Sequence, residues 1–527
     1  MNSSKSELAA IYPRCRTLFD HDTWQQIVSS PGLNHKPENF LEIVGSYSPH
    51  ARLPEFVAEL ARLEWNISQV KEKNISMPDN PEEIVINPTL LLLELQWKNL
   101  ANDVSSISAQ APEPGKEYVL IWKHPQDGEV HVKTASQEDL LILKMISESI
   151  DRKEVAQIGT ISTLAVDVAF DRAVHRGIII APPSRIRRDF DAIETSPYAR
   201  EQFLSSPSFT LQWHITQDCD LQCKHCYDRS ERTAPTLEQA ITIIDDLDNF
   251  CRQRHVKGQI SFTGGNPLLH PDFLSIYRAA SDRGFKLSVL GNPTTREHIV
   301  TLLSIQQPDI FQVSLEGLPE YNNFIRGDGH FEKTMLFLEI LREFGIYSMV
   351  MLTMTKENIY QILPLAELLR GKANVFYFNR LSKVGEGASL ELPSKQEYIS
   401  FLEMYVSACE KNPVLGLKDN LINVLNYQEG SAPFGGCTGF GCGAAFNFVA
   451  VLSDGEVHAC RKFPSPIGNI SHQKIAEIYD SEIAERYRSG CAECRLCLLR
   501  PVCGGCLASA YSYGLDVFEK KDPYCFF

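Results

Sequence analysis

The most informative segment of this sequence reads Thr216-Gln-Asp-Cys219-Asp-Leu-Gln-Cys223-Lys-His-Cys226-Tyr227. Its three cysteines have the spacing Cys-x3-Cys-x2-Cys. They follow a run at residues 209–215 in which apolar and polar side chains alternate, as in a strand. Three thiolates can hold three irons of a [4Fe–4S] cluster, which ordinarily takes four cysteines. One iron then stays open to a non-protein ligand, so the spacing predicts a reactive site, as an open position does at catalytic zinc.

A zinc knuckle is the structural alternative for the same three cysteines. Zinc prefers four protein ligands in paired cysteine motifs. No fourth ligand is obvious in the segment, although His225 lies inside it. The spacing therefore favours the cluster over zinc.

The segment resembles the cysteine motif of the radical SAM enzymes. This resemblance implies that S-adenosylmethionine (SAM) chelates the open iron of a cluster held by Cys219, Cys223 and Cys226, which are then both metal ligands and catalytic residues. It also implies reductive cleavage of SAM to a 5′-deoxyadenosyl radical that abstracts hydrogen from the substrate. The protein's part is to position the reactants, deliver electrons and exclude water.

Length and composition exclude several classes of protein. A chain of 527 residues predicts about three to four domains. Its 51 basic and 66 acidic residues argue against a nucleic-acid partner. No run of 18 apolar residues and no apolar signal core is found, so we expect a cytoplasmic protein without a membrane partner. Fifteen cysteines in such a chain indicate metal or redox chemistry rather than disulfides.

Residues 205–385 alternate short β-rich runs with helix-length segments. Such β–α repeats predict parallel strands with right-handed crossovers. Six units fit an incomplete TIM-like barrel, the fold of the radical SAM family, with the site at the carboxyl ends of the strands. The expected fold class is α/β with a partial (β/α)6 barrel. Further strands are expected at 259–263, 285–290, 310–315, 347–352 and 375–378, and helices at 236–255, 331–345 and 358–371.

A glycine-rich segment after the second strand also matches the radical SAM pattern. Gly264-Gly265-Asn266-Pro267 stands where family members usually carry Gly-Gly-Glu-Pro, at the strand edge that binds the SAM amino group. Glycines permit close backbone approach. Asn in place of Glu keeps an acceptor but loses the charge that pairs with an ammonium. A plain turn is the alternative.

Further SAM contacts are expected after the fourth strand and beside the last cysteine. Ser314 and Glu316 resemble the family's Ser-x-Asp/Glu-Gly element near the ribose, and Arg326 resembles its arginine near the SAM carboxylate. Tyr227 is expected near the adenine. The alternatives are a plain strand end for Ser314 and Glu316, a solvated side chain for Arg326 and simple core burial for Tyr227.

Nine of the fifteen cysteines lie between residues 437 and 525, and their spacing resembles the SPASM auxiliary-cluster domain. One gap is two residues where that pattern has three. The resemblance implies two fully ligated auxiliary [4Fe–4S] clusters with interleaved ligands. The first would use Cys437, Cys442, Cys460 and Cys506, and the second Cys494, Cys497, Cys503 and Cys525. A pair of zinc sites is the alternative to the two clusters. Cys491 could replace Cys494 as a ligand. Outside this region, we expect Cys15, Cys251 and Cys409 to be ordinary apolar residues.

The first 200 residues carry no metal motif. Apolar residues at three- and four-residue steps predict a helix at 53–65. Two strand-like runs, 118–122 and 130–133, flank a turn at 125–128, and helices are expected at 137–149, 152–159 and 163–176. A hairpin with three helices resembles a winged-helix peptide-recognition element, whose edge strand can capture a leader peptide. A scaffold domain is the alternative.

Together these features predict five parts of the chain. They are a helical region (1–112), a winged-helix-like domain and linker (113–200), the radical SAM core (201–390), a helical bridge (391–430) and the SPASM domain (431–527).

The expected function is radical SAM maturation of a ribosomally made precursor peptide, for example by thioether formation, crosslinking or oxidation at Cys or neighbouring residues, with flavodoxin or ferredoxin as reductant. The chain comes nearest to maturases assigned to thio(seleno)oxazole-type modification. A sulfatase-maturase-like dehydrogenase that makes formylglycine from Cys or Ser is one alternative. A non-catalytic iron–sulfur protein that binds peptides is the other.

Overall fold

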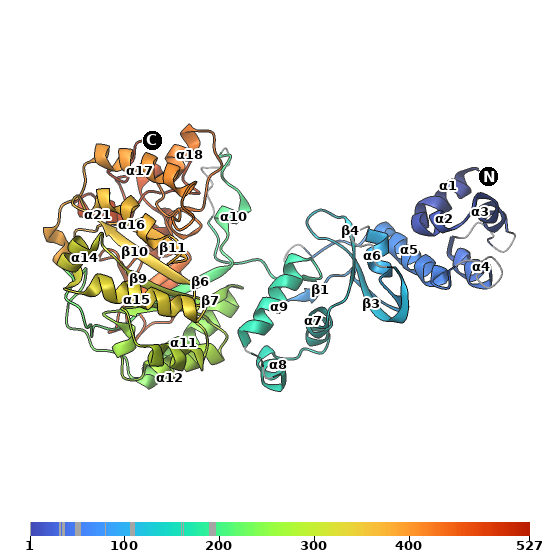
Figure 1. The fold of residues 1–527 in the computed structure, drawn as a ribbon, viewed down its shortest axis with the longest axis horizontal. Helices are drawn as coiled ribbons and strands as arrows, with labels where there is room; N and C mark the ends of the chain where they lie inside the picture. Colours follow the sequence, from blue (N-terminus) through green and yellow to red (C-terminus); the bar gives the residue numbers. More distant parts are fainter. Residues whose placement is uncertain are drawn as a thin grey trace. The chain divides into compact units, whose positions relative to one another are not determined.

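The computed structural model describes residues 2–30, 33, 37–47, 54–78, 81–105, 111–159, 161, 163–188 and 196–527 (Figure 1). The chain divides into two compact units, Met1–Pro183 and Ser184–Phe527. None of the helices in the described ranges is long and apolar enough to cross a membrane.

The first unit is built on a three-stranded antiparallel sheet of order β2-β3-β4. The central strand, β3 (Glu113–Lys123), sends alternate side chains to opposite faces, as strand geometry requires. Val119 and Ile121 join a core with the first helices, whereas Leu120 and Trp122 join a separate core with the later helices. One strand therefore serves two hydrophobic cores.

The elements of the first unit have the following bounds. The helices are α1 (Asn2–Ile11), α2 (Pro13–Leu18), α3 (His21–Val28), α4 (Phe40–Tyr47), α5 (Val57–Glu72), α6 (Leu100–Ser105), α7 (Gln137–Ser147), α8 (Arg152–Gly159) and α9 (Thr163–His175). The other strands are β2 (Leu91–Lys98), β4 (Val130–Thr134) and the antiparallel pair β1 (Val85–Ile86) and β5 (Ile179–Ile180).

The predicted hairpin and the three helices that follow it are confirmed. Gly128 supplies the positive φ of 71° at the turn between β3 and β4. A capping box between Ser136 and Asp139 starts α7. Strand β2 was not predicted; it pairs with β3 and places a strand inside the segment expected to be helical.

The second unit contains six consecutive parallel strands in the order β11-β10-β9-β8-β7-β6. They confirm the predicted partial barrel, and each predicted strand is present. Their bounds are β6 (Ser208–Thr216), β7 (Lys257–Gly264), β8 (Lys286–Leu290), β9 (Ile310–Ser314), β10 (Ser348–Met354) and β11 (Val375–Arg380).

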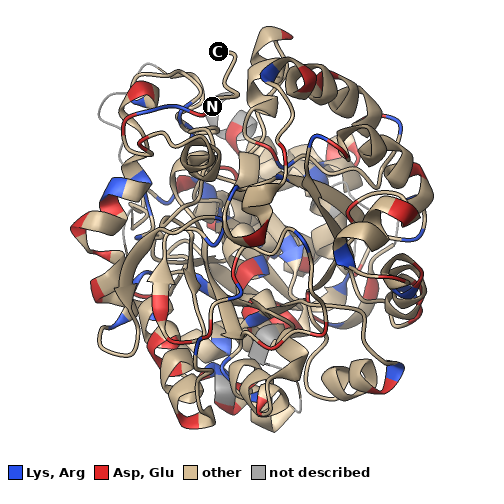
Figure 2. Ribbon diagram, turned by 90° about the vertical axis from the view of Figure 1, so that its left-hand side faces the viewer, with Lys and Arg blue, Asp and Glu red and all other residues tan. Residues whose placement is uncertain are grey.

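Helices pack around this sheet, as Figure 1 shows for α11, α12, α15 and α16. The first of them, α11, begins with a capping box between Thr236 and Gln239 and buries its apolar face. In Figure 2, acidic and basic residues are intermingled along the ribbon. The helices are α10 (Glu201–Leu204), α11 (Leu237–Gln253), α12 (Phe273–Asp282), α13 (Arg296–Leu303), α14 (Pro319–Arg326), α15 (His330–Glu343), α16 (Ile362–Leu369), α17 (Lys395–Cys409) and α18 (Ile422–Gln428).

The cysteine-rich C-terminal region continues the barrel sheet. Strand β12 (Phe448–Val451) pairs in parallel with β6, and β13 (Glu456–His458) and β14 (Pro466–Asn469) extend the sheet by antiparallel pairing. The remaining helices are α19 (Ile475–Tyr479), α20 (Glu482–Ser489) and α21 (Leu507–Ser512). The sheet thus has nine strands rather than six.

Candidate active site and auxiliary cluster sites

A cavity of about 490 Å³ lies at the carboxyl ends of the barrel strands. The residues predicted to bind the cluster or SAM fall into two groups around it. Those that line the cavity are Cys219, Cys223, Cys226, Tyr227, Gly264, Gly265, Ser314 and Arg326. Asn266, Pro267 and Glu316 are buried outside this lining set. Three thiols on one cavity wall are a donor set that suits a three-cysteine cluster site.

Two glycines at the carboxyl end of β7, Gly264 and Gly265, are required by the loop that carries Cys219, Cys223 and Cys226, here called the cysteine loop. A Cβ on Gly264 would lie 2.2 Å from the carbonyl oxygen of Thr216, and one on Gly265 would lie 2.2 Å from that of Asp218. The amide of Gly265 donates to the Thr216 carbonyl at 2.9 Å. The strand edge therefore holds the start of the cysteine loop by direct backbone contact.

Asn266 is fixed by a carboxylate of the cysteine loop. Its Nδ2 donates to Asp220 Oδ1 at 3.0 Å, and Asn292 Nδ2 donates to the same oxygen at 2.6 Å. Asn292 also points its Nδ2 at Cys219 Sγ, 3.7 Å away. An amide can donate to Asp220 whereas a carboxylate cannot, so Asp220 accounts for Asn at the position where the family usually has Glu.

Glu316 and Arg326 form a buried ion pair beside the cysteines. Arg326 Nη2 lies 2.6 Å from Glu316 Oε1, and His225 Nε2 lies 2.8 Å from the same oxygen. Burial alone would raise the pKa of Glu316, but the charges of His225 and Arg326 outweigh it and lower the pKa to about 2. Arg326 Nη1 also lies 3.7 Å from Cys223 Sγ. Glu316 thus anchors an arginine and a histidine of the site, and the ribose contact expected for it stays a prediction.

Tyr227 packs against a buried histidine of β6. Its hydroxyl lies 3.1 Å from the ring nitrogens of His214, and the two rings meet edge to face. Burial lowers the pKa of His214 to about 3, so this histidine is neutral. Tyr227 lines the cavity, and its expected adenine contact stays a prediction.

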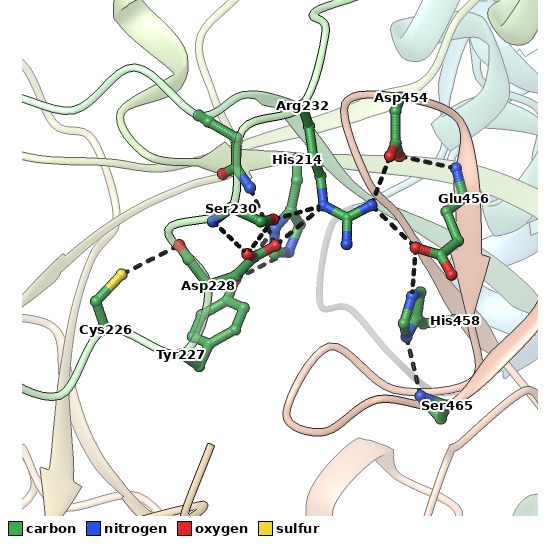
Figure 3. Close-up of polar contacts among 11 residues, drawn as sticks. His214, Cys226, Tyr227, Asp228, Ser230, Arg232, Asp454, Glu456, His458 and Ser465 are labelled. Atoms are coloured by element: carbon green, nitrogen blue, oxygen red, sulfur yellow. Dashed lines mark hydrogen bonds and ion pairs between the residues drawn. The ribbon is translucent and has the colours of Figure 1, made fainter. Parts of the chain in front are cut away.

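Arg232 connects the cysteine loop with the β12–β13 turn (Figure 3). Its Nε donates to Asp228 Oδ2 at 3.3 Å, and its Nη1 donates to Asp454 at 2.5 Å and to Glu456 at 2.9 Å. The carbonyl of Asp228 lies 3.3 Å from Cys226 Sγ. One arginine therefore bridges the loop of the three cysteines and the cysteine-rich region.

The eight predicted auxiliary ligands line two separate cavities, in the two sets of four expected from the sequence. Cys437, Cys442, Cys460 and Cys506 line the first. Cys494, Cys497, Cys503 and Cys525 line the second. Cys491 is not among the residues that line the second cavity, although its thiol is hydrogen-bonded to that of Cys494. Four thiols around each cavity are the donor set of a fully ligated cluster.

The active-site cavity adjoins the first auxiliary cavity, because Asn379, Arg380 and Lys462 line both. Arg380 is 4% exposed and is held by Asp419 at 2.8 Å and by Asp522 at 2.9 Å. Asp522 in turn accepts the amide of Cys506 at 3.0 Å. The last residue of β11 thus touches both cavities and indirectly positions a cysteine.

Several residues of the site carry no motif in the sequence. Asp220 lies inside the cysteine segment, and Asn292 follows β8, at the carboxyl-end position where barrel sites lie. These two positions in the sequence were the signal from which Asp220 and Asn292 could have been predicted as site residues. His214, Arg232 and Arg380 act through contacts with distant segments, which one sequence does not reveal.

Comparison with known families agrees with this geometry. Residues 213–369 match the radical SAM superfamily, and residues 442–506 match SPASM, an iron–sulfur cluster-binding domain. The fold and the site thus define a radical SAM enzyme. More narrowly, the chain carries both a radical SAM domain, which binds a [4Fe–4S] cluster and SAM, and a SPASM domain, which is an iron–sulfur cluster-binding domain.

Three curated relatives cover similar parts of the chain. The AdoMet-dependent heme synthase of Methanosarcina barkeri is 27% identical over 60% of this chain and 96% of its own length. AlbA, the antilisterial bacteriocin subtilosin biosynthesis protein of Bacillus subtilis, is 27% identical over 56% of this chain and 66% of its own. The mycofactocin maturase MftC of Mycobacterium tuberculosis is 28% identical over 63% of this chain and 87% of its own.

A solved structure shares the fold over a larger part of the chain. SuiB of Streptococcus suis superposes with a TM-score of 0.51 at 17% identity, covering 78% of this chain and 96% of that one. At this identity the likeness shows the fold.

Proposed function

We propose that this enzyme matures a ribosomally synthesised precursor peptide. The observation that carries the proposal is the direct contact between the active-site cavity and the first four-cysteine cavity, through Asn379, Arg380 and Lys462. A substrate radical formed in the active-site cavity would then lie beside the first auxiliary cluster, which could take its electron. The names of AlbA and MftC, which concern a bacteriocin and a maturase, support a peptide substrate.

The residues have distinct proposed roles. Cys219, Cys223 and Cys226 would hold the catalytic cluster, and the two four-cysteine sets would each hold an auxiliary cluster. When bound, the catalytic cluster and SAM supply a 5′-deoxyadenosyl radical that abstracts hydrogen from the substrate. Gly264 and Gly265 keep the loop of the three cysteines against the strand edge, and Arg326 supplies a positive charge at the cavity wall for the SAM carboxylate.

Lys418 is the proposed proton acceptor for the oxidised substrate. It lines the first auxiliary cavity, and its Nζ donates to Asn379 Oδ1 at 3.0 Å, on the shared wall. Burial lowers the pKa of Lys418 to about 8, so a neutral amine is accessible near physiological pH.

In the first unit, the β3–β4 hairpin with α7, α8 and α9 is the proposed binding site for the leader part of the peptide. β2 and β4 are the outer strands of the three-stranded sheet. An outer strand offers backbone donors and acceptors to an added peptide strand.

The test is anaerobic and uses the full chain. After reconstitution, iron and sulfide are counted and 5′-deoxyadenosine is measured with SAM and dithionite, beside a Cys219/Cys223/Cys226→Ala variant. We expect about twelve irons, falling to about eight in the variant with loss of cleavage. Iron without cleavage in the parent protein would favour a non-catalytic binding protein.

The substrate class needs a second measurement. A short peptide encoded beside the gene is incubated with the enzyme, and its mass is followed together with 5′-deoxyadenosine. A loss of hydrogens from that peptide supports the proposal. Conversion of Cys to formylglycine in a sulfatase-derived peptide instead would identify a sulfatase-maturase-like enzyme. One relative is a heme synthase, whose name does not concern a peptide. The decisive result is therefore whether 5′-deoxyadenosine formation depends on the added peptide.

A further inference from the structure

Arg188 reaches into the loop that carries the first auxiliary cysteines. Its backbone is fixed near the start of the second unit, because its amide donates to the Leu204 carbonyl at 2.9 Å. The side chain is buried, with the residue 5% exposed. Nη1 donates to the carbonyl of Phe440 at 2.5 Å, and Nη2 donates to that of Cys442. The guanidinium also stacks on the Phe446 ring, 4.0 Å from its centroid.

The charge of Arg188 has no carboxylate partner in the described part of the chain, and its Nε makes no hydrogen bond there. The charged side chains that act on it include two further buried arginines, Arg488 and Arg500. Arg488 donates to the Ala445 carbonyl at 3.0 Å, on the same loop. A buried cation costs several kcal/mol unless an anion compensates it. Arg488 has a carboxylate partner, Glu485 at 2.8 Å, whereas the described part of the chain supplies none for Arg188.

We propose that Arg188 is the counter-charge and a positioning residue of the auxiliary cluster held by Cys437, Cys442, Cys460 and Cys506. In a four-cysteine cluster the thiolates outweigh the positive charge of the iron–sulfide core, so the bound group is an anion. The two carbonyl contacts keep the guanidinium at the backbone of one ligand. A fixed positive charge there favours the reduced form and raises the reduction potential of this cluster relative to one without it. The inference rests on the cluster site under the proposed function.

The test uses the Cys219/Cys223/Cys226→Ala protein, which retains the two auxiliary sites. Into this background are placed Arg188→Met, Arg188→Lys and, as a control, Arg187→Met, whose guanidinium pairs with the exposed Glu201. Iron content, reduction potentials followed by EPR, and Tm before and after reconstitution are measured for each. No activity is needed.

For Arg188→Met we expect a more negative potential for one of the two auxiliary signals, or its loss with about four of eight irons. We also expect a smaller rise in Tm on reconstitution. Arg188→Lys keeps the charge and should restore most of the potential. Arg187→Met should match the background.

Two outcomes would overturn the proposal. Equal Tm losses in the apo and reconstituted forms with unchanged potentials would mean that Arg188 only supports the fold. Full iron, unchanged potentials and an unchanged Tm rise would mean that it does neither. Failure of the background protein itself to bind iron would instead refute the cluster site.

Discussion

The guanidinium of Arg326 lies 2.6 Å from the carboxylate of Glu316. Both groups are nearly inaccessible to solvent, and the carboxylate also accepts the amide of Thr353 at 2.7 Å. A strand end is thus connected to a helix end and, through His225, to the cysteine loop. This relationship makes the geometry of the site sensitive to acid.

We expect Glu316→Gln to destabilise the protein by about 3 kcal/mol or more, because it leaves Arg326 buried without its counter-charge. The pKa of Glu316 is lowered from 4.5 to about 2, so its contribution to stability is complete above about pH 4.5 and is lost as the pH falls towards 2. Urea unfolding of the two proteins at several pH values measures this, and their difference should shrink in acid. Glu343→Gln, in an exposed pair with Arg296, is the control. A pH-independent difference would contradict the assignment.

Restoring the usual family residue should impair this enzyme. In Asn266→Glu a carboxylate replaces the amide that donates to Asp220, so two like charges meet in the cysteine loop. We expect SAM affinity of the reconstituted protein, measured by anaerobic equilibrium dialysis, to fall by about tenfold or more. Asp220→Asn in the same protein should recover most of it. Tighter SAM binding by the single variant would disprove the pairing.

Gly265→Ala should displace the cysteine loop. The new Cβ would lie 2.2 Å from the Asp218 carbonyl, which a backbone shift must relieve at a cost of about 1–3 kcal/mol. Iron retention at the catalytic site and Tm report the change. Gly45→Ala is the control, because no atom lies within 4 Å of its Cβ position and its φ is not positive. Equal iron contents in the two variants would show that the close approach of residue 265 to the Asp218 carbonyl does not matter for the catalytic site.

Lys418→Met should lower the rate of product formation and leave SAM cleavage unchanged. Loss of a proton acceptor typically costs about 10²–10⁴-fold in rate, whereas the cysteine loop is unaltered. Parent product formation should rise with increasing pH, because the buried Lys418 amine must lose its proton before it can accept one from the substrate. Lys411→Met, at an exposed position, is the control. Equal losses of both activities would argue for a structural role.

The second auxiliary site should depend on Cys494 and not on Cys491. Only Cys494 lines the cavity with Cys497, Cys503 and Cys525. Cys494→Ala should therefore lower the iron content from about twelve to about eight, while Cys491→Ala leaves it unchanged. Retention of iron in both single variants with loss in the double variant would show that the two thiols substitute for one another.

Local periodicity predicted the barrel because each strand between β7 and β11 is a short apolar run bounded by a helix. The β3–β4 hairpin was predictable because residues 125–128 carry turn chemistry. Strand β2 was missed although Leu93 and Leu95 alternate with polar residues, since the preceding leucines obscure the period. The pairing of Asn266 with Asp220, and that of Arg232 with Asp454, joins segments far apart in sequence. Long-range pairs of this kind leave no local signal.

The parallel pairing of β12 with β6 has a consequence for how the chain can be divided. A fragment that ended before Phe448 would leave β6 with a row of unsatisfied backbone donors and acceptors along one side. Such an edge invites pairing with other molecules and aggregation. The cysteine-rich region is therefore not a detachable module, and swapping it between enzymes would require the strand to move with it.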